Sequence, residues 1–228
     1  TLVKDKTFTG ERQTMLVSLL HNDGKGYMNQ YGRVESVTDL GSFDFNISGN
    51  NFRLTDGGTS GNNVKGNGNN YVAWVWKAGG APTATNSGGV NPTSGSVFRD
   101  GVSSTTAFAS GCDIYPTKAS IGSHGLSILT YVGQTGTKSL ATGLSAAPDL
   151  AIVKRISNGG DWQFISNATG SLTNFELNNA TGSGIGVPIS SFGADKINGL
   201  NGGGVNDAQT YVCYLINRKV GLCALGSY

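Results

Sequence analysis

The side chains that could carry out catalysis are few and lie far apart along the chain. The two histidines, His21 and His124, each lie beside a Gly or Asn turn and outside any HExxH or GxSxG motif. Hydrolysis and group transfer need a nucleophile with its base, two opposed carboxylates or a metal cluster. The sequence contains none of these patterns. We therefore predict a protein that is not an enzyme and that needs no cofactor and no metal.

The carboxylates are spread singly through predicted turns. Asp23, Asp56 and Asp100 each precede a glycine, a pair that is typical of turns. Calcium binding is the alternative interpretation, but the sequence has no DxDxDG loop. The glycine-rich segments 182–186 and 202–204 lack the strand-to-helix context, and the following Lys-Ser or Lys-Thr, of a phosphate-binding loop. These segments therefore predict turns as well.

Two sets of residues are candidates for carrying or binding a glycan. Asn46, Asn167 and Asn179 match the N-glycosylation pattern, although such matches arise easily by chance in a chain so rich in Asn, Ser and Thr. Trp76 and Trp162 are the candidates for stacking on a sugar ring of a cell-surface glycan, with packing in the core as the alternative for both.

The composition decides the fold class. Gly, Asn, Ser and Thr make up 101 of the 228 residues, Glu occurs three times, and only 13% of the residues are charged. Soluble domains usually have about 25% charged residues. This composition excludes a helical bundle, the glycines lack the three-residue period of collagen, and 37% hydrophobic residues are too many for a disordered chain. We predict an all-β protein with short antiparallel strands and long polar turns.

Charge and cysteine usage limit the partners. The net charge is +2 and no basic run is longer than Arg218-Lys219, so we expect no nucleic-acid partner. No apolar stretch reaches the roughly 18 residues of a membrane-spanning helix, so we expect no membrane partner. Because the sequence begins at Thr1, we expect a processed or partial chain. Cys112, Cys213 and Cys223 have no metal-ligand spacing; buried free thiols, or one disulfide and a free thiol, are the two alternatives.

The sequence contains an internal repeat. Residues 70–77 (NYVAWVWK) and 210–217 (TYVCYLIN) match as strands, and each closes a unit whose opening strand contains a Val-Lys pair, at Lys4 and at Lys154. Both closing strands are apolar on both faces, as is expected of a strand in the centre of a two-sheet sandwich. We predict a duplication.

The repeat defines the expected organisation: a first β-sandwich in residues 1–79, a Gly/Ser/Thr-rich linker in residues 80–123, and a second, similar jelly-roll or lectin-like sandwich in residues 124–219. Residues 126–141 predict a hairpin leading into the second sandwich, and the first sandwich has no counterpart of this hairpin. Other predicted strands cover residues 14–20 (or a helical turn at 16–20), 26–30, 43–47, 51–54, 96–99, 150–155, 162–166, 174–177, 187–192 and 195–200.

Several of these stretches carry a family resemblance. Residues 69–82 (NNYVAWVWKAGGAP), 125–133 (GLSILTYVG) and 143–154 (GLSAAPDLAIVK) resemble a repeated module of unknown function. That module is found in predicted tail-fibre and structural proteins of aquatic bacteriophages and in related environmental sequences. The resemblance covers most of the chain. It implies a structural protein of an extracellular appendage or of the virion surface, with a lectin-like sandwich, and it identifies neither a ligand nor a catalytic residue.

The two ends of the sequence suggest how such a protein assembles. Residues 220–228 look like the start of a hairpin with no domain to join, and the first sandwich lacks its opening hairpin. A sheet that lacks a strand exposes unpaired N–H and C=O groups. We therefore expect the segment 220–228 of a neighbouring copy to fill this gap and to build a homopolymeric filament head to tail. The residues expected to enter the gap are Leu222, Ala224, Leu225 and Tyr228.

Three classes of function thus compete at the level of sequence. A structural, self-assembling subunit agrees with the duplication, the incomplete ends and the low charge. A carbohydrate- or receptor-binding module would need a concave site of aromatic and Asn side chains. An enzyme would need a carboxylate pair or a histidine-centred cluster that only folding brings together.

Overall fold

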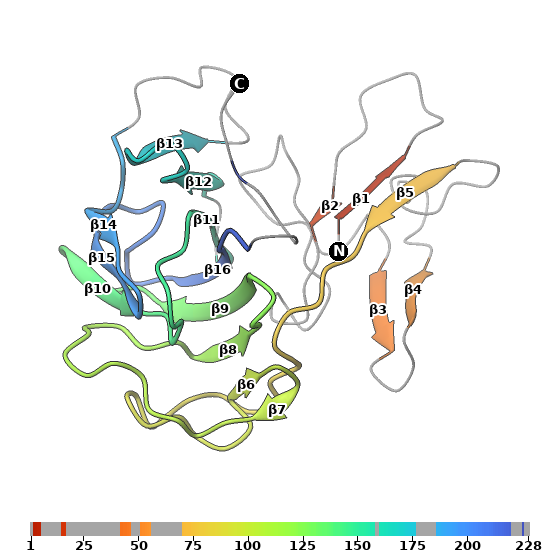
Figure 1. Cartoon of the computed structure of the whole chain (residues 1–228), viewed down its shortest axis with the longest axis horizontal. Helices are drawn as coiled ribbons and strands as arrows, with labels where there is room; N and C mark the ends of the chain where they lie inside the picture. Colours follow the sequence, from red (N-terminus) through yellow and green to blue (C-terminus); the bar gives the residue numbers. More distant parts are fainter. Residues whose placement is uncertain are drawn as a thin grey trace. The chain divides into compact units, whose positions relative to one another are not determined.

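The structure is a computed structural model that describes residues 2–5, 15–16, 42–46, 51–55, 70–157, 160–176, 186–219 and 225. Its chain forms two compact units, Thr1–Trp76 and Lys77–Tyr228. Every regular element in the described ranges is a β-strand, which confirms the all-β prediction (Figure 1). Within the same ranges, no helix is long and apolar enough to cross a membrane.

The first unit contains two small antiparallel sheets in its described part. In one sheet β1 (Leu2–Asp5) lies between β2 (Met15–Leu16) and β5 (Tyr71–Trp74). The other is the hairpin of β3 (Ser42–Asn46) and β4 (Asn51–Thr55), drawn in orange in Figure 1. The strand predicted at residues 26–30 lies outside the described residues. β5 is therefore an edge strand among the described elements of this unit.

The second unit is built on an eight-stranded sheet with the order β13-β12-β11-β16-β9-β8-β6-β7. All neighbouring strands in it run antiparallel except β6 and β8, which are parallel. Its strands are β6 (Val97–Arg99), β7 (Val102–Ser103), β8 (Lys118–Ile121), β9 (Leu126–Val132), β11 (Leu150–Arg155), β12 (Gln163–Ser166), β13 (Thr173–Glu176) and β16 (Thr210–Ile216). A second sheet has the order β10 (Lys138–Ala141), β15 (Lys196–Leu200), β14 (Ser191–Phe192).

The two sheets of the second unit share one hydrophobic core. Tyr211, Cys213 and Leu215 alternate along β16 and are fully buried in a cluster that also contains Leu140 of β10 and Ile197 of β15. Removing each such side chain from water stabilises the fold by about 1.5–3 kcal/mol. Of the two closing strands predicted to be central, β16 is central, because it lies between β11 and β9 and its five inner residues are buried. The other, β5, lies at the edge of its sheet among the described strands.

The segment 80–123, which composition marks as a linker, is instead part of the second unit. It contains β6, β7 and β8, which extend the large sheet beyond β9. Val97 and Ala119 are fully buried, and Phe108 and Ile114 join the same core cluster. A few well-spaced apolar residues are therefore enough to fold a segment whose average composition is that of a linker.

The hairpin predicted in residues 126–141 does not form, because its two strands belong to different sheets. β9 pairs with β16 and β8, whereas β10 pairs with β15. The chain crosses from one sheet to the other through residues 133–137. At Gly133 a Cβ atom would overlap the backbone of Asp207, so a side chain there would displace the loop that faces the crossover.

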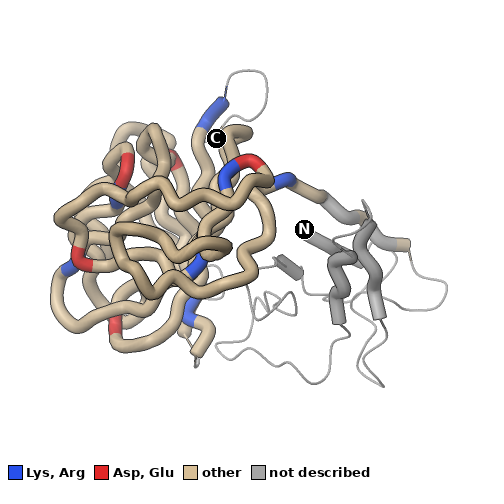
Figure 2. Tube along the Cα trace, turned by 90° about the horizontal axis from the view of Figure 1, so that it is seen from below, with Lys and Arg blue, Asp and Glu red and all other residues tan. Residues whose placement is uncertain are grey.

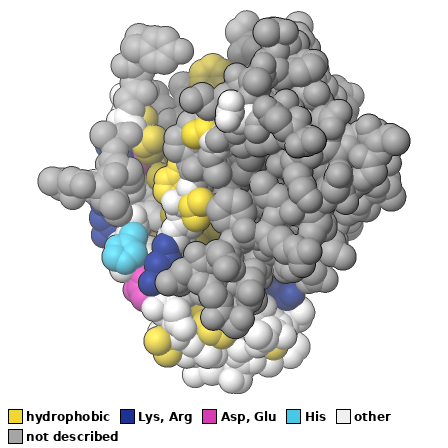
Figure 3. Space-filling model, turned by 90° about the vertical axis from the view of Figure 1, so that its right-hand side faces the viewer, with side chains coloured by type: hydrophobic (Ala, Val, Ile, Leu, Met, Phe, Trp, Pro, Cys, Tyr) yellow, Lys and Arg dark blue, Asp and Glu magenta, His cyan; other side chains and the backbone are white. Residues whose placement is uncertain are grey.

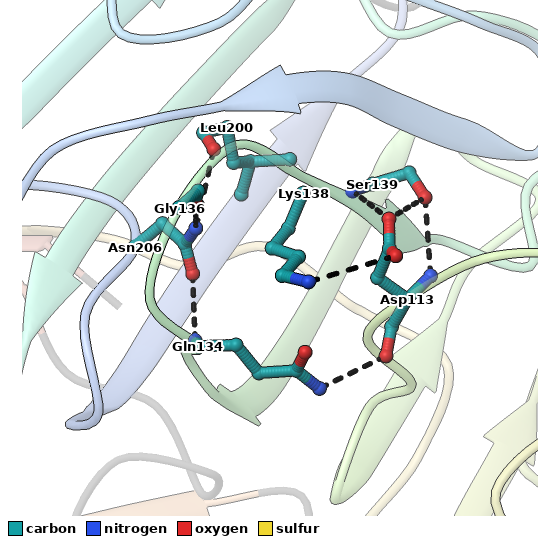
Figure 4. A network of polar contacts seen from close by, with 7 residues as sticks. All are labelled: Asp113, Gln134, Gly136, Lys138, Ser139, Leu200 and Asn206. Atoms are coloured by element: carbon teal, nitrogen blue, oxygen red, sulfur yellow. Dashed lines mark hydrogen bonds and ion pairs between the residues drawn. The ribbon is translucent and has the colours of Figure 1, made fainter.

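The buried side chain of Asn206 holds this crossover in place (Figure 4). Its Oδ1 accepts a hydrogen bond from the backbone N–H of Gln134 at 2.7 Å, and its Nδ2 donates to the carbonyl oxygens of Gly136 at 2.6 Å and Leu200 at 3.2 Å. One amide side chain thus uses both donors and its acceptor on backbone groups. These bonds join the crossover to β15 and therefore link the two sheets.

A second contact in Figure 4 fixes the start of β10. The Asp113 carboxylate accepts hydrogen bonds from the backbone N–H and the hydroxyl of Ser139, at 2.8 and 2.7 Å. These bonds lower the pKa of Asp113 from its ordinary value, because they favour the ionised carboxylate. Lys138 lies 3.9 Å from the same carboxylate. These contacts between an exposed loop and the start of β10 hold the strand in position.

Candidate functional site

Two groups of three strands, one in each unit, pair in the same register. In the first unit Val3 pairs with Ala73, and in the second Val153 pairs with Cys213. The strand on the other side follows the same offset, since Val3 also pairs with Met15 and Val153 with Gln163. The remaining matched pairs are Leu2–Trp74 with Ile152–Tyr214, Lys4–Val72 with Lys154–Val212, Asp5–Tyr71 with Arg155–Tyr211, and Leu2–Leu16 with Ile152–Phe164. The order β2-β1-β5 thus corresponds to β12-β11-β16.

The hairpin of the first unit also has a counterpart. Asn46 pairs with Asn51 across residues 47–50, and Phe192 pairs with Ile197 across residues 193–196. Each hairpin precedes, along the chain, the strand that closes its unit. The correspondence between the units therefore includes five strands of each.

The two units differ at the outer edge of the closing strand. In the second unit this edge of β16 is paired along its whole length with β9. Among the described residues of the first unit, no strand pairs with the corresponding edge of β5. We call residues 71–76, which comprise β5 and the two residues that follow it, the β5 edge.

The β5 edge ends in two exposed apolar residues. Val75 is 61% exposed and Trp76 is 52% exposed. The register places Leu215 and Ile216 at the corresponding positions of β16, where Leu215 is fully buried and Ile216 pairs with Leu126 of β9. The same positions thus lie in a paired strand in the second unit and beside no described strand in the first. Large apolar side chains exposed side by side are typical of an interaction surface.

β9 shows what such a covering strand contributes. Tyr131 of β9 stacks on Tyr211 of β16 with ring centroids 5.1 Å apart. The Tyr131 hydroxyl donates a 2.6 Å hydrogen bond to the carbonyl oxygen of Val205, and the Tyr211 hydroxyl donates one of 2.9 Å to that of Gly203. The strand therefore supplies core side chains and also anchors the loop that precedes β16.

Tyr211 gives this core a predicted pH dependence. Burial raises the pKa of Tyr211 to about 12, from an ordinary value near 10. The phenol is therefore still protonated in the folded chain at pH values where it ionises in the unfolded chain, and unfolding releases a proton. The free energy of unfolding should keep this contribution below about pH 10 and lose it as the pH rises towards 12. Urea denaturation at a series of pH values measures this loss, and Tyr211→Phe should make it smaller; an unchanged slope would contradict the assignment.

Of the two tryptophans predicted to bind a glycan, only Trp76 presents its ring to solvent. Trp162 is fully buried, so core packing, the alternative interpretation, describes it. The ammonium group of Lys154 lies 5.9 Å from the centre of the Trp162 ring and donates hydrogen bonds to the carbonyl oxygens of Arg155 and Gly160, both at 2.9 Å. Lys154 is itself 1% exposed, and a buried ammonium needs such partners. The structure does not bring the two tryptophans together in one binding site.

The other predicted site residues lie in separate parts of the chain. Asn46 is the last residue of β3, and Asn167 is partly buried just after β12, where its N–H donates to the carbonyl oxygen of Asp149. Leu225 is partly buried and belongs to no strand. The glycosylation candidate Asn179 lies outside the described residues, as do three residues of the predicted assembly strand, Leu222, Ala224 and Tyr228.

His124 lies on the surface in a polar turn, while His21 lies outside the described residues. Asp100 near it accepts a 2.8 Å hydrogen bond from the Ser123 N–H, which lowers the pKa of Asp100; the nearby charges of His124 and Lys77 act in the same direction. Figure 3 shows the imidazole of the described histidine beside acidic and basic side chains. The described residues hold no group of three or more His, Cys, Asp or Glu side chains that would suit a metal ion.

The described thiols and charges add no further site. Cys112 and Cys213 are buried free cysteines, as in the first alternative, and burial raises the pKa of both thiols; Cys223 lies outside the described residues. Basic and acidic residues are scattered along the described trace and form no continuous basic stripe there (Figure 2). The β5 edge therefore remains the one described feature whose exposure contrasts with that of its counterpart in the same chain.

Comparison with known proteins gives a family without a function. Residues 28–228 match a family described as a domain of unknown function (DUF7483). The chain belongs to the DUF7483 family. No curated protein and no solved structure matches it. In this DUF7483 protein the matched residues include β3, β4 and β5 of the first unit and every strand of the second. Because the family description names no activity, a role has to be argued from the β5 edge itself.

Proposed function

We propose that this DUF7483 protein is a non-enzymatic structural subunit of an extracellular fibre or virion appendage, which assembles head to tail by strand addition at the β5 edge. The observation that carries the proposal is the exposure of Val75 and Trp76 at positions whose counterparts, Leu215 and Ile216, lie in a strand that pairs with β9. The resemblance to bacteriophage tail-fibre modules supports the same class of function and the location outside the cell.

In this proposal the two units are copies of one lectin-like β-sandwich module. The common register of β2-β1-β5 and β12-β11-β16, and the matching hairpins, support a duplication. The second unit contains all the strands that the module needs, since two sheets share its core. A strand in the position of β9 beside β5 would extend the order β2-β1-β5 of the first unit to match the order β12-β11-β16-β9 of the second.

The chemistry of the β5 edge favours pairing with another chain. Natural edge strands are usually protected by charges, proline or bulges. Residues 71–76 (YVAWVW) contain neither a charge nor a proline. A strand added here gains backbone hydrogen bonds along β5 and removes Val75 and Trp76 from water. The donor segment and the acceptor edge are different surfaces, so the contact is heterologous, and it repeats into a filament when the rotation between subunits does not close a ring.

A carbohydrate- or receptor-binding module is the alternative function, and the exposed ring of Trp76 is the observation that favours it. An exposed indole can stack on a sugar ring. The burial of Trp162 leaves this site with one described tryptophan, which is why we place assembly first. A glycan array probed with the wild-type chain and with Trp76→Ala separates the two functions, because sugar binding through Trp76 would be lost in the variant.

Deletion of residues 220–228 tests the assembly function. The truncated chain should remain as soluble protomers under conditions in which the full chain forms fibres, because the donor strand is missing. A variant with these nine residues replaced by a Gly/Ser segment of equal length is the matched control for chain length, and it should also remain unassembled. Fibres of normal length in electron micrographs of either variant would contradict the proposal.

A further inference from the structure

The register of β9 on β16 gives a template for the strand that binds the β5 edge. Leu126 of β9 pairs with Ile216, and Ser127 pairs with Leu215. The ladder continues with Ile128 opposite Tyr214 and Leu129 opposite Cys213. Leu129 is fully buried in the core of the second unit. A strand that replaces β9 therefore needs a leucine at the position of Leu129, opposite Cys213. The three residues before this leucine should be small or apolar.

A segment near the C-terminal end of the sequence matches residues 125–129 at the glycine and at both leucines. Residues 125–129 read Gly-Leu-Ser-Ile-Leu, and residues 221–225 read Gly-Leu-Cys-Ala-Leu. The chain contains two further Gly-Leu dipeptides, at residues 143–144 and 199–200. In neither case does a second leucine follow three positions after the leucine of the dipeptide. The segment 221–225 is therefore the best match to β9 in the chain, and it carries three of the residues expected from the sequence to form the assembly strand.

Transferring the β9 register to β5 fixes every partner. Leu222 is then paired with Trp76, and Cys223 with Val75. Further along, Ala224 is paired with Trp74, and Leu225 with Ala73.

Two observations on the single chain favour a second copy as the source of the strand. Val75 and Trp76 are 61% and 52% exposed. Leu225 of the same chain lies outside any strand. We infer that residues 221–225 of a second copy bind the β5 edge antiparallel, in the register in which β9 binds β16. This inference rests on the proposed function and names its partner, donor segment and alignment.

A disulfide between copies tests the alignment. Paired residues on neighbouring antiparallel strands have Cβ atoms about 4.5–5.5 Å apart, close to the roughly 3.5–4.5 Å of a disulfide. In Val75→Cys the new thiol should therefore lie opposite Cys223 of the next copy. Mild oxidation of the full-length variant should give a ladder of dimers, trimers and longer species on a non-reducing gel. Cys112 and Cys213 are buried and compete little for oxidation.

Two control variants make the result specific. Adding Cys223→Ser to Val75→Cys should abolish the ladder, because the partner thiol is gone. Val102→Cys places a thiol on a comparably exposed valine (68%) in β7, a strand that the inferred pairing does not use, and should give no ladder. If the ladder survives Cys223→Ser, or if Val75→Cys gives only an internal disulfide in monomers, the inferred donor is wrong.

Different experimental results would contradict this inference and the proposed function. If Val75→Cys forms fibres under the electron microscope but no ladder on the gel, subunits assemble through another strand or register, which overturns the inference and leaves the proposed function. If the wild-type chain forms no fibres and Val75→Cys no ladder, both are overturned. A ladder that forms in Val75→Cys and is lost when Cys223→Ser is added supports both the inference and the proposed function.

Discussion

The double substitution Val75→Lys and Trp76→Lys is expected to leave the chain as monomers under conditions in which the wild-type chain forms fibres. Both side chains are more than half exposed in the single chain, so the substitutions should not disturb its folding. In the assembled state each buried apolar side chain contributes about 1.5–3 kcal/mol. Each 1.4 kcal/mol changes an affinity tenfold. Losing both should thus weaken association by roughly 100-fold or more, which sedimentation velocity measures.

The matched control for this variant is Val102→Lys. Val102 is 68% exposed and lies in β7, the last strand of the eight-stranded sheet. The proposed contact does not use this strand, so Val102→Lys should assemble like the wild type. If Val102→Lys blocks fibres and the double substitution does not, assembly runs through β7 and the role given to the β5 edge is wrong.

The substitution Asn206→Asp is expected to lower the free energy of unfolding by about 2–4 kcal/mol, because it removes two hydrogen-bond donors from a buried position. The new carboxylate would face the carbonyl oxygens of Gly136 and Leu200, to which the amide now donates. It would keep the acceptor for the N–H of Gln134. The change is nearly isosteric, so the loss measures the hydrogen bonds that hold the crossover between the sheets. Urea denaturation followed by tryptophan fluorescence gives the value.

Gln134→Ala provides the comparison within the same network. The exposed Gln134 side chain makes one hydrogen bond, a 3.0 Å bond to the carbonyl oxygen of Asp113. Its backbone N–H, which binds Asn206, is unaffected by the substitution. Gln134→Ala should therefore cost no more than about 0.5–1 kcal/mol. Equal unfolding midpoints for Asn206→Asp and the wild type would show that Asn206 does not hold the crossover.

The strands that carry the core of the second unit could be predicted from the sequence, because the chain marks them locally. Residues 126–132 were predicted as a strand and are β9, and residues 210–217 contain β16. Runs of β-branched and aromatic residues bounded by glycine turns are a signal that needs no knowledge of partners. The same applies to β11, which coincides with residues 150–155.

The pairing of strands was harder to predict, because it depends on residues far apart in the chain. β9 and β10 are separated by a short polar segment and look like a hairpin, yet β10 pairs with β15. The side chain that directs the crossover, Asn206, lies about 70 residues further along the sequence. A single buried asparagine in a chain with so many asparagines gives no local signal of this role.

Burial was also difficult to predict where a residue type suits two environments. Trp76 and Trp162 were both candidates for sugar stacking, and the structure exposes one and buries the other beneath Lys154. The exposure of Val75 and Trp76 becomes informative only beside Leu215 and Ile216, the matching positions of a strand that pairs with β9. The repeat predicted from the sequence therefore contributed most to the candidate site.

The most direct test of strand addition at the β5 edge is electron microscopy of the purified wild-type chain, at concentrations checked by sedimentation velocity. We predict regular, unbranched fibres in which identical subunits repeat head to tail, in equilibrium with a small fraction of free monomers. A single monomeric species at every concentration, with no fibres on the grids, would contradict the proposed assembly.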